Sequence, residues 1–190
     1  QKERNLDFCL TQISDCAIIS SEISPAGAIK LVSHCWDVVL KFLHSGIMCR
    51  GYITRGSIYH TPIQVFGTGY LKAYDAQPRV SVFKREEDEK GLPFVEVDQA
   101  FCNYIRECED AHVKEMFSRL TMGDGAGVAI FPFKRLSHSF AVVGLDPEKE
   151  KQYNQNLRDC INNYKKQVMI YIDSSNKSAV SKSKHYINAL

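Results

Sequence analysis

The stretch that decides the fold is Leu10-Thr11-Gln12-Ile13-Ser14-Asp15-Cys16-Ala17-Ile18-Ile19. Residues 7–13 alternate loosely between apolar and polar side chains, which predicts a β-strand, and the apolar run over 16–21 predicts a second strand. Ser14 and Asp15 lie between the two strands and are turn-forming residues. We therefore expect a β-hairpin that carries one carboxylate, Asp15, at its tip.

The elements after the hairpin indicate an α+β fold. Pro25 opens an amphipathic helix whose apolar positions recur every three or four residues, and Gly46 ends it. The sequence then predicts strands over 47–59, 78–83 and 139–143, helices over 70–76, 97–108, 109–122, 147–167 and from 185 onward, and loops over 84–92 and 174–184. We expect a single domain over 1–190 in which helices pack on one sheet.

The composition excludes several classes of protein. Hydrophobic residues make up 44% and charged residues 24% of the 190 residues, values typical of a globular domain with a buried core. A net charge of +2 argues against a nucleic-acid partner, and no apolar run is long enough for a membrane span. Seven cysteines without a CxxC pair argue against a zinc site and predict reduced thiols in a cytoplasmic protein.

Asp15 has two interpretations that the residues alone leave open. An aspartate in a β-turn commonly satisfies the backbone groups of that turn. A carboxylate that projects from the rigid tip between two apolar strands is also the hard oxygen ligand that Mg²⁺ or Mn²⁺ takes. The six histidines show no metal-ligand spacing, so we expect them in surface or core positions. Residues 123–127 hold glycines but lack a GK[ST] sequence and predict a turn.

Several motifs in register resemble class III nucleotidyl cyclases. The segment 11–16 resembles the hairpin in which that family has a Gly-Asp turn, with an Asp that binds one of two metals. The segment 50–57 resembles the strand that ends in a Thr-Gly step, and 65–74 resembles the segment in which a Trp-Gly or Phe-Gly pair opens a helix. With Pro78-Arg79-Val80, these motifs are most similar to bacterial pyrimidine cyclases of the Pycsar antiphage systems, over residues 7–83.

The resemblance implies a ferredoxin-like or palm-type antiparallel sheet packed with helices, with 84–190 as the C-terminal part of the same domain. It implies that Asp15 binds one ion of a two-metal Mn²⁺ or Mg²⁺ site. The family's other metal aspartate belongs to a first strand that this sequence lacks, and we expect that strand upstream of Gln1.

The resemblance also assigns ligand-binding positions. Thr11 and Gln64 occupy the two base-reading positions, and because both can donate and accept hydrogen bonds they suit a pyrimidine edge. From the residues alone, Thr11 is equally a β-branched strand residue and Gln64 a solvated loop residue. Lys134 and Arg135 are candidate triphosphate contacts, although an exposed Lys-Arg pair is commonly only solvated.

The helix after Phe66-Gly67 departs from the family. Purine cyclases place an Asn and an Arg there for the transition state, whereas this chain has Leu71 and Asp75. Arg55 and Lys72 are the candidate catalytic cations in their stead, with an ordinary surface role as the alternative.

The expected function is the conversion of UTP or CTP to the 3′,5′-cyclic monophosphate and pyrophosphate, as a signal in antiphage defence. The resemblance implies a homodimer with sites at the interface, and no nucleic-acid or membrane partner. The alternative is an inactive cyclase-fold module that binds a nucleotide or a protein. A related palm-type polymerase or diguanylate cyclase is disfavoured because no GGDEF-like turn is present.

Overall fold

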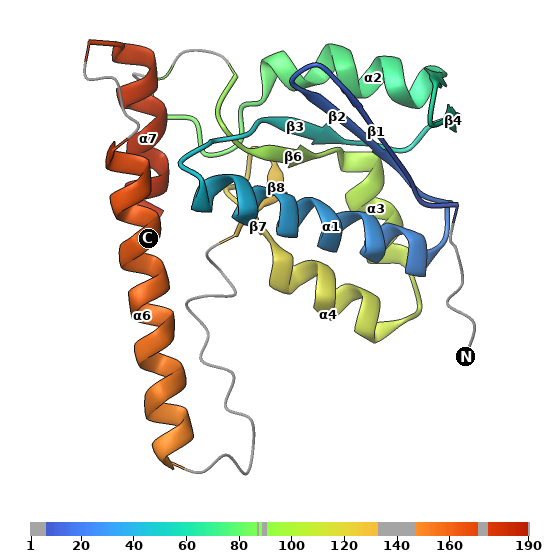
Figure 1. Cartoon of the computed structure of the whole chain (residues 1–190). Helices are drawn as coiled ribbons and strands as arrows, with labels where there is room; N and C mark the ends of the chain where they lie inside the picture. Colours follow the sequence, from blue (N-terminus) through green and yellow to red (C-terminus); the bar gives the residue numbers. More distant parts are fainter. Residues whose placement is uncertain (1–6, 87, 89–90, 133–146, 171–174, 190) are drawn as a thin grey trace.

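The computed structural model describes residues 7–86, 88, 91–132, 147–170 and 175–189 (Figure 1). Strands β1 (Cys9–Ile13) and β2 (Cys16–Ser20) pair antiparallel, with Ile13 opposite Cys16 and Cys9 opposite Ser20. This register leaves a two-residue turn, Ser14-Asp15. The predicted hairpin is therefore confirmed, and its strands lie within the predicted ranges.

Helix α1 (Pro25–His44) follows the hairpin as its sequence pattern predicts. The Ser24 hydroxyl caps the helix by accepting a hydrogen bond from the Gly27 backbone N–H at 3.0 Å, and Pro25 supplies a fixed φ in the first turn. The apolar stripe of α1 enters the main core cluster, whose buried members are Ala28, Leu31, Val32, Trp36, Val39, Ile53, Val97, Phe101, Cys102, Ile105, Val113, Leu120 and Ile130.

A four-stranded sheet lies against α1. Its strands are β3 (Gly51–Ile53), β6 (Val95–Val97), β7 (Thr121–Gly123) and β8 (Val128–Ile130), in the order β3-β6-β8-β7. The β3–β6 pair is parallel and the other two pairs are antiparallel. The sheet is thus mixed rather than antiparallel as expected, and hairpin β1–β2 forms a separate two-stranded sheet.

The segment expected as one long strand over 47–59 is broken after Ile53. The chain then forms a second separate hairpin of β4 (Tyr59–Thr61) and β5 (Gln64–Phe66), followed by helix α2 (Thr68–Ala76). The start of α2 lies so close to the preceding loop that a Cβ on Gly69 would stand 3.1 Å from the Gly56 backbone. Gly67 enters the helix with a φ of 136°, which favours glycine.

The strand expected over 78–83 does not form. The 3-10 helix η1 (Gln77–Arg79) takes its first part, because Pro78 suits a helical first turn. The backbone N–H groups of Ser81 and Val82 donate to the Glu96 carboxylate at 2.8 and 3.2 Å, and that of Phe83 donates to Asp124 at 2.5 Å. Side-chain carboxylates thus replace the strand partner that this segment lacks.

Two helices cover the main core cluster beside α1, namely α3 (Gln99–Glu107) and α4 (Ala111–Leu120). Both lie within the predicted helical ranges, although β6 takes Val97, where the helix was expected to begin. The Asp110 carboxylate caps α4 by accepting hydrogen bonds from the N–H groups of His112 and Val113.

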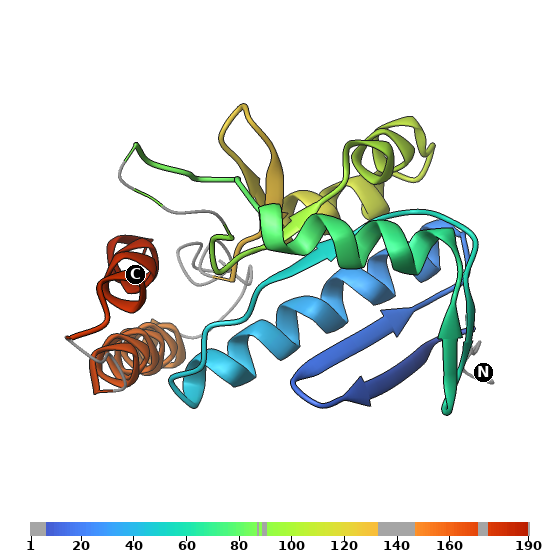
Figure 2. The same ribbon diagram turned by 90° about the horizontal axis from the view of Figure 1, so that it is seen from above.

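Helices α6 (Pro147–Ile170) and α7 (Lys177–Ala189) lie at one end of the molecule, away from hairpin β4–β5 at the other end (Figure 2). The loop predicted over 174–184 is wrong, because α7 begins at Lys177. His185 Nε2–H donates to the buried Asp88 carboxylate at 2.8 Å, and the Tyr186 ring stacks on the Phe94 ring with 5.5 Å between their centres. These contacts give α7 a buried face that a Ser/Lys-rich sequence hides.

The described residues therefore form an α+β fold with one mixed sheet and two separate hairpins. No helix within these residues has the length and apolar character that a bilayer crossing requires. The strand predicted over 139–143 lies outside the described residues.

Candidate functional site

Asp15 stands at the exposed tip of hairpin β1–β2. Ser14, the first residue of the turn, has a φ of 55°, whereas Asp15 is not in the positive-φ region. A positive φ at the first position of a two-residue hairpin turn normally takes glycine. No hydrogen bond or ion pair links the Asp15 carboxylate to another described residue, so its oxygens face solvent.

Thr11 lies lower on the same hairpin and is held by hairpin β4–β5. Its hydroxyl donates to the Thr61 carbonyl at 3.2 Å and lies 3.0 Å from Nε2 of His60. The other ring nitrogen of His60, Nδ1, lies 2.7 Å from the Ser20 hydroxyl. One imidazole therefore bridges both strands of the first hairpin.

Gln64 is not brought together with Thr11. Gln64 pairs with Thr61, and the adjacent pair in the ladder is His60 with Val65. Because successive side chains of a strand point to opposite faces, Gln64 lies on the face of β4–β5 opposite to His60. The side chain of that hairpin that contacts Thr11 is His60, which the sequence analysis assigned only a surface or core position. Gln64 is exposed on the outer face.

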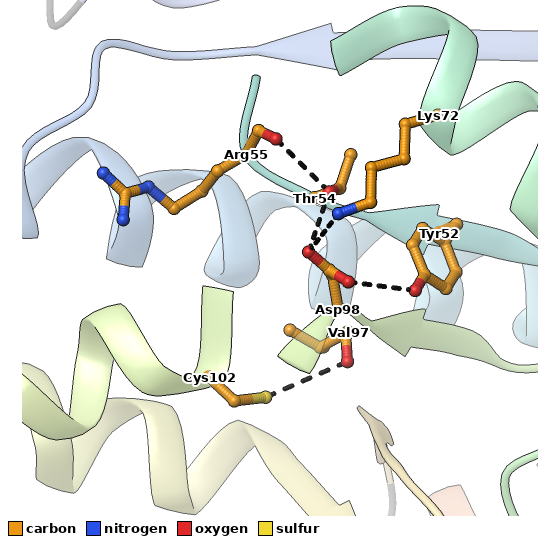
Figure 3. Close-up of polar contacts among 7 residues, drawn as sticks. All are labelled: Tyr52, Thr54, Arg55, Lys72, Val97, Asp98 and Cys102. Carbon is orange, nitrogen blue, oxygen red and sulfur yellow. Dashed lines mark hydrogen bonds and ion pairs between the residues drawn. The ribbon is translucent and has the colours of Figure 1, made fainter. Parts of the chain in front are cut away.

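A second group of polar side chains gathers where parallel strands β3 and β6 end (Figure 3). The Asp98 carboxylate follows β6 and accepts three hydrogen bonds: from Lys72 Nζ at 2.8 Å, Thr54 Oγ1 at 3.0 Å and Tyr52 Oη at 3.2 Å. Asp98 also occupies the N-cap position of α3 but makes no side-chain capping bond there. Its carboxylate instead fixes α2 to the sheet edge.

The environment sets the ionisation of this group. Burial alone would raise the pKa of Asp98, but hydrogen bonds from Lys72 and Thr54 and the Lys72 charge outweigh it and hold the pKa below its ordinary value. Burial, followed by the Asp98 charge, raises the pKa of Tyr52 to about 12. Asp98 is therefore ionised and Tyr52 neutral at physiological pH. The Lys72 side chain is 48% exposed and the Asp98 side chain 11% exposed.

Arg55 does not join Lys72. Its guanidinium carbon lies 4.2 Å from the centre of the Tyr104 ring, a cation–π contact, and Figure 3 shows it extending away from the Lys72–Asp98 pair. The other two predicted cations, Lys134 and Arg135, lie outside the described residues.

An open depression of about 480 Å³ lies beside this cation–π contact, between the start of α1 and the α3–α4 turn. Its lining residues are Pro25, Tyr104, Glu107, Cys108, Glu109 and Asp110. Of the predicted site residues that the structure describes, none lines it, and three carboxylates make it unsuited to a triphosphate.

Two site residues were missed in the sequence, His60 and Asp98. Asp98 ends the segment Val95-Glu96-Val97, and the apolar alternation there could have indicated a strand with a polar residue at its carboxyl end. His60 carries no comparable local signal, because its partners Thr11 and Ser20 lie 49 and 40 residues away in the chain.

No protein-family model, curated protein or solved structure matches this chain. A function for this chain is therefore inferred from its residues, their geometry and the motif resemblance described above.

Proposed function

We propose that this chain is a class III cyclase-like domain that converts UTP or CTP to the 3′,5′-cyclic monophosphate and pyrophosphate, as an antiphage signal. The observation that carries the proposal is Asp15, an exposed carboxylate at the tip of a two-stranded hairpin. The strained backbone of Ser14 beside it supports a functional turn, because such conformations gather at functional sites.

The donor chemistry at Asp15 fits a hard divalent cation. A solvent-facing carboxylate supplies the oxygen ligand that Mg²⁺ and Mn²⁺ prefer. Among the described residues, no group of three or more metal-ligating side chains is present. The two-metal site therefore needs further ligands from beyond the described residues or from a second copy, and we propose a homodimer.

The reaction joins the ribose 3′-oxygen to the α-phosphorus, with the hydroxyl proton passing to solvent water, breaks the bond between that phosphorus and the bridging oxygen of the β-phosphate, and releases pyrophosphate. When bound, Mg²⁺ or Mn²⁺ would neutralise the phosphate charge and lower the pKa of the attacking hydroxyl. Asp15 binds and orients the cation. Lys72 donates one ammonium N–H to the Asp98 carboxylate. Its side chain is half-exposed, so the other two N–H donors can bind phosphate oxygens.

The test is a turnover assay of the full chain with Mn²⁺ and each of the four nucleoside triphosphates. We expect a cyclic product from UTP or CTP, and we expect Asp15→Ala to lower turnover at least 100-fold and to weaken Mn²⁺ binding measured by electron paramagnetic resonance. Asp37→Ala is the matched control, because Asp37 is an exposed aspartate on α1.

The proposal fails if the chain consumes no nucleotide and Asp15→Ala leaves Mn²⁺ binding unchanged. Nucleotide binding without turnover would favour the second candidate, an inactive cyclase-fold binding module. One observation favours that module: Leu71 and Asp75, which replace the family's Asn and Arg, are exposed on α2 and Leu71 presents an apolar side chain to solvent.

A further inference from the structure

The two hairpins are joined to each other by side chains. Neither pairs with the four-stranded sheet, and each is a separate two-stranded sheet. Hydrogen bonds to hairpin β4–β5 come from Cys9, Thr11 and Ser20 of hairpin β1–β2, which share one face of the first hairpin. All three make hydrogen bonds to His60 or to its neighbour Thr61.

The hydrogen bonds identify the form of the His60 ring. The Thr11 hydroxyl has one proton, which it donates to the Thr61 carbonyl, so it must accept from N–H of His60 Nε2. In the neutral ring, His60 Nδ1 is then an acceptor, and the Ser20 hydroxyl donates a hydrogen bond to it. The neutral Nε2–H tautomer satisfies every one of these groups. Burial also lowers the pKa of His60, which favours the neutral ring.

We propose that His60 is a positioning residue whose neutral imidazole bridges the two hairpins and thereby fixes where the Asp15 carboxylate stands. This inference rests on the proposed function, in which Asp15 is the metal ligand. Asp15 lies four residues beyond Thr11, which at about 3.3 Å per residue places it roughly 13 Å from the bridge. A hairpin tilt of about 10° would move the tip by about 2 Å, whereas a functional site holds its groups within about 0.5 Å.

The hairpin has a second attachment that preserves the fold without His60. Ile19 lies on the opposite face from Thr11 and packs against the main core cluster. A variant that lacks the imidazole therefore keeps this contact and the bonds from Cys9 and Thr11 to backbone carbonyls of β4, but it loses both ring bonds, including the one that holds β2 through Ser20. This separates a positioning role from a simple contribution to global stability.

The test compares His60→Leu, which removes both ring hydrogen bonds, with His60→Gln, whose amide N–H can still donate to Thr11. Hydrogen exchange of residues 9–20 should rise at least tenfold in His60→Leu while that of α1 stays unchanged, and His60→Gln should restore most of the protection. Mn²⁺ affinity should fall at least tenfold in His60→Leu and less than threefold in His60→Gln. Nitrogen NMR of the wild-type ring should show the Nε2–H tautomer.

Unchanged exchange over residues 9–20 in His60→Leu would overturn the proposal, as would an Nδ1–H tautomer. Equal Mn²⁺ affinity in the wild type and His60→Leu, alongside faster hairpin exchange, would also overturn it. The exchange and tautomer measurements need no activity. If the wild type binds no Mn²⁺ and turns over no nucleotide, the proposed function fails, and these two measurements still decide whether His60 holds the hairpin.

Discussion

Ser14 adopts a backbone conformation that residues with a Cβ avoid. Its φ of 55° places it in the left-handed region, where the side chain crowds the following carbonyl. The turn holds it there because only two residues connect Ile13 to Cys16. The tip that carries Asp15 is therefore strained, and its geometry is imposed by the strands on either side.

Replacing Ser14 by glycine should stabilise the protein. Relief of the left-handed strain is worth about 1–2 kcal/mol, and the greater freedom of glycine in the unfolded chain offsets part of it, so we expect a net gain of about 0.5–1 kcal/mol in the free energy of unfolding. Urea unfolding measures this. Ser81→Gly is the control, because Ser81 is exposed and has no positive φ; it should destabilise. A loss of stability in Ser14→Gly would contradict the strain argument.

At this scale the sequence predicts single residues well where the pattern is local. Asp15 was placed at a hairpin tip because turn chemistry needs only its neighbours in the chain. Thr11 was assigned a base-reading role, which no contact here tests, but its bond to His60 joins residues 49 positions apart and no local pattern encodes it. The same holds for Lys72 and Asp98, which lie 26 positions apart.

At the scale of elements, the strands and helices predicted from the sequence are confirmed where apolar periodicity determines the structure. They are wrong where contacts between distant residues determine it. Helix α1 was predicted because its buried stripe is regular. The 78–83 segment has the composition of a strand, yet the Glu96 and Asp124 carboxylates take up its N–H groups. The sequence predicts helix α7 only from His185 onward, because the Ser/Lys-rich residues 177–184 show no apolar stripe, and their contact with the rest of the fold is polar, as in the hydrogen bond from Ser181 to Asp88.

The attachment of α7 depends on the charge of Asp88. Burial alone would raise the pKa of Asp88, but hydrogen bonds from the Arg85 N–H, His185 and Ser181 outweigh it and hold the pKa below its ordinary value of 3.8. A carboxyl group with a lowered pKa in the folded state contributes stability above its ordinary pKa and loses it as pH falls further.

Asp88→Asn should therefore destabilise the protein at pH 7 by about 3 kcal/mol, because it leaves buried partners of the carboxylate unsatisfied. The difference from the wild type should shrink as pH falls below about 4, where the wild-type carboxylate takes up its proton. Urea unfolding between pH 3 and pH 7 measures both. Asp37→Asn, at an exposed position, is the control; a pH-independent difference for Asp88→Asn would contradict the role of charge.

At the scale of the whole molecule, one end carries a set of exposed apolar side chains. They belong to hairpin β4–β5, the residue before it and helix α2, and are Ile58, Tyr59, Ile63, Phe66, Leu71 and Tyr74. Tyr59 and Phe66 stack at 4.8 Å, and Ile63 is 87% exposed. The proposed homodimer needs a surface of this kind, because burial of such side chains drives association.

Ile63→Lys should weaken dimerisation at least tenfold, because a buried Ile contributes roughly 1.5–3 kcal/mol and a lysine cannot replace it. Analytical ultracentrifugation over a concentration series measures the dissociation constant. Ile47→Lys is the matched control, since Ile47 is an exposed isoleucine beyond the end of α1, outside this surface. A monomeric wild type at every concentration would contradict the homodimer.

The contact between α7 and the Asp88 loop also has a consequence for how the chain reaches its fold. His185 and Asp88 lie 97 residues apart, so their pairing closes a long loop at an entropic cost. The two hairpins and α1, by contrast, need only neighbouring residues and can form early. During synthesis, Phe94 emerges from the ribosome roughly 5–20 s before Tyr186, which later covers it. The nascent chain therefore exposes an apolar surface for that interval, when a chaperone can bind it.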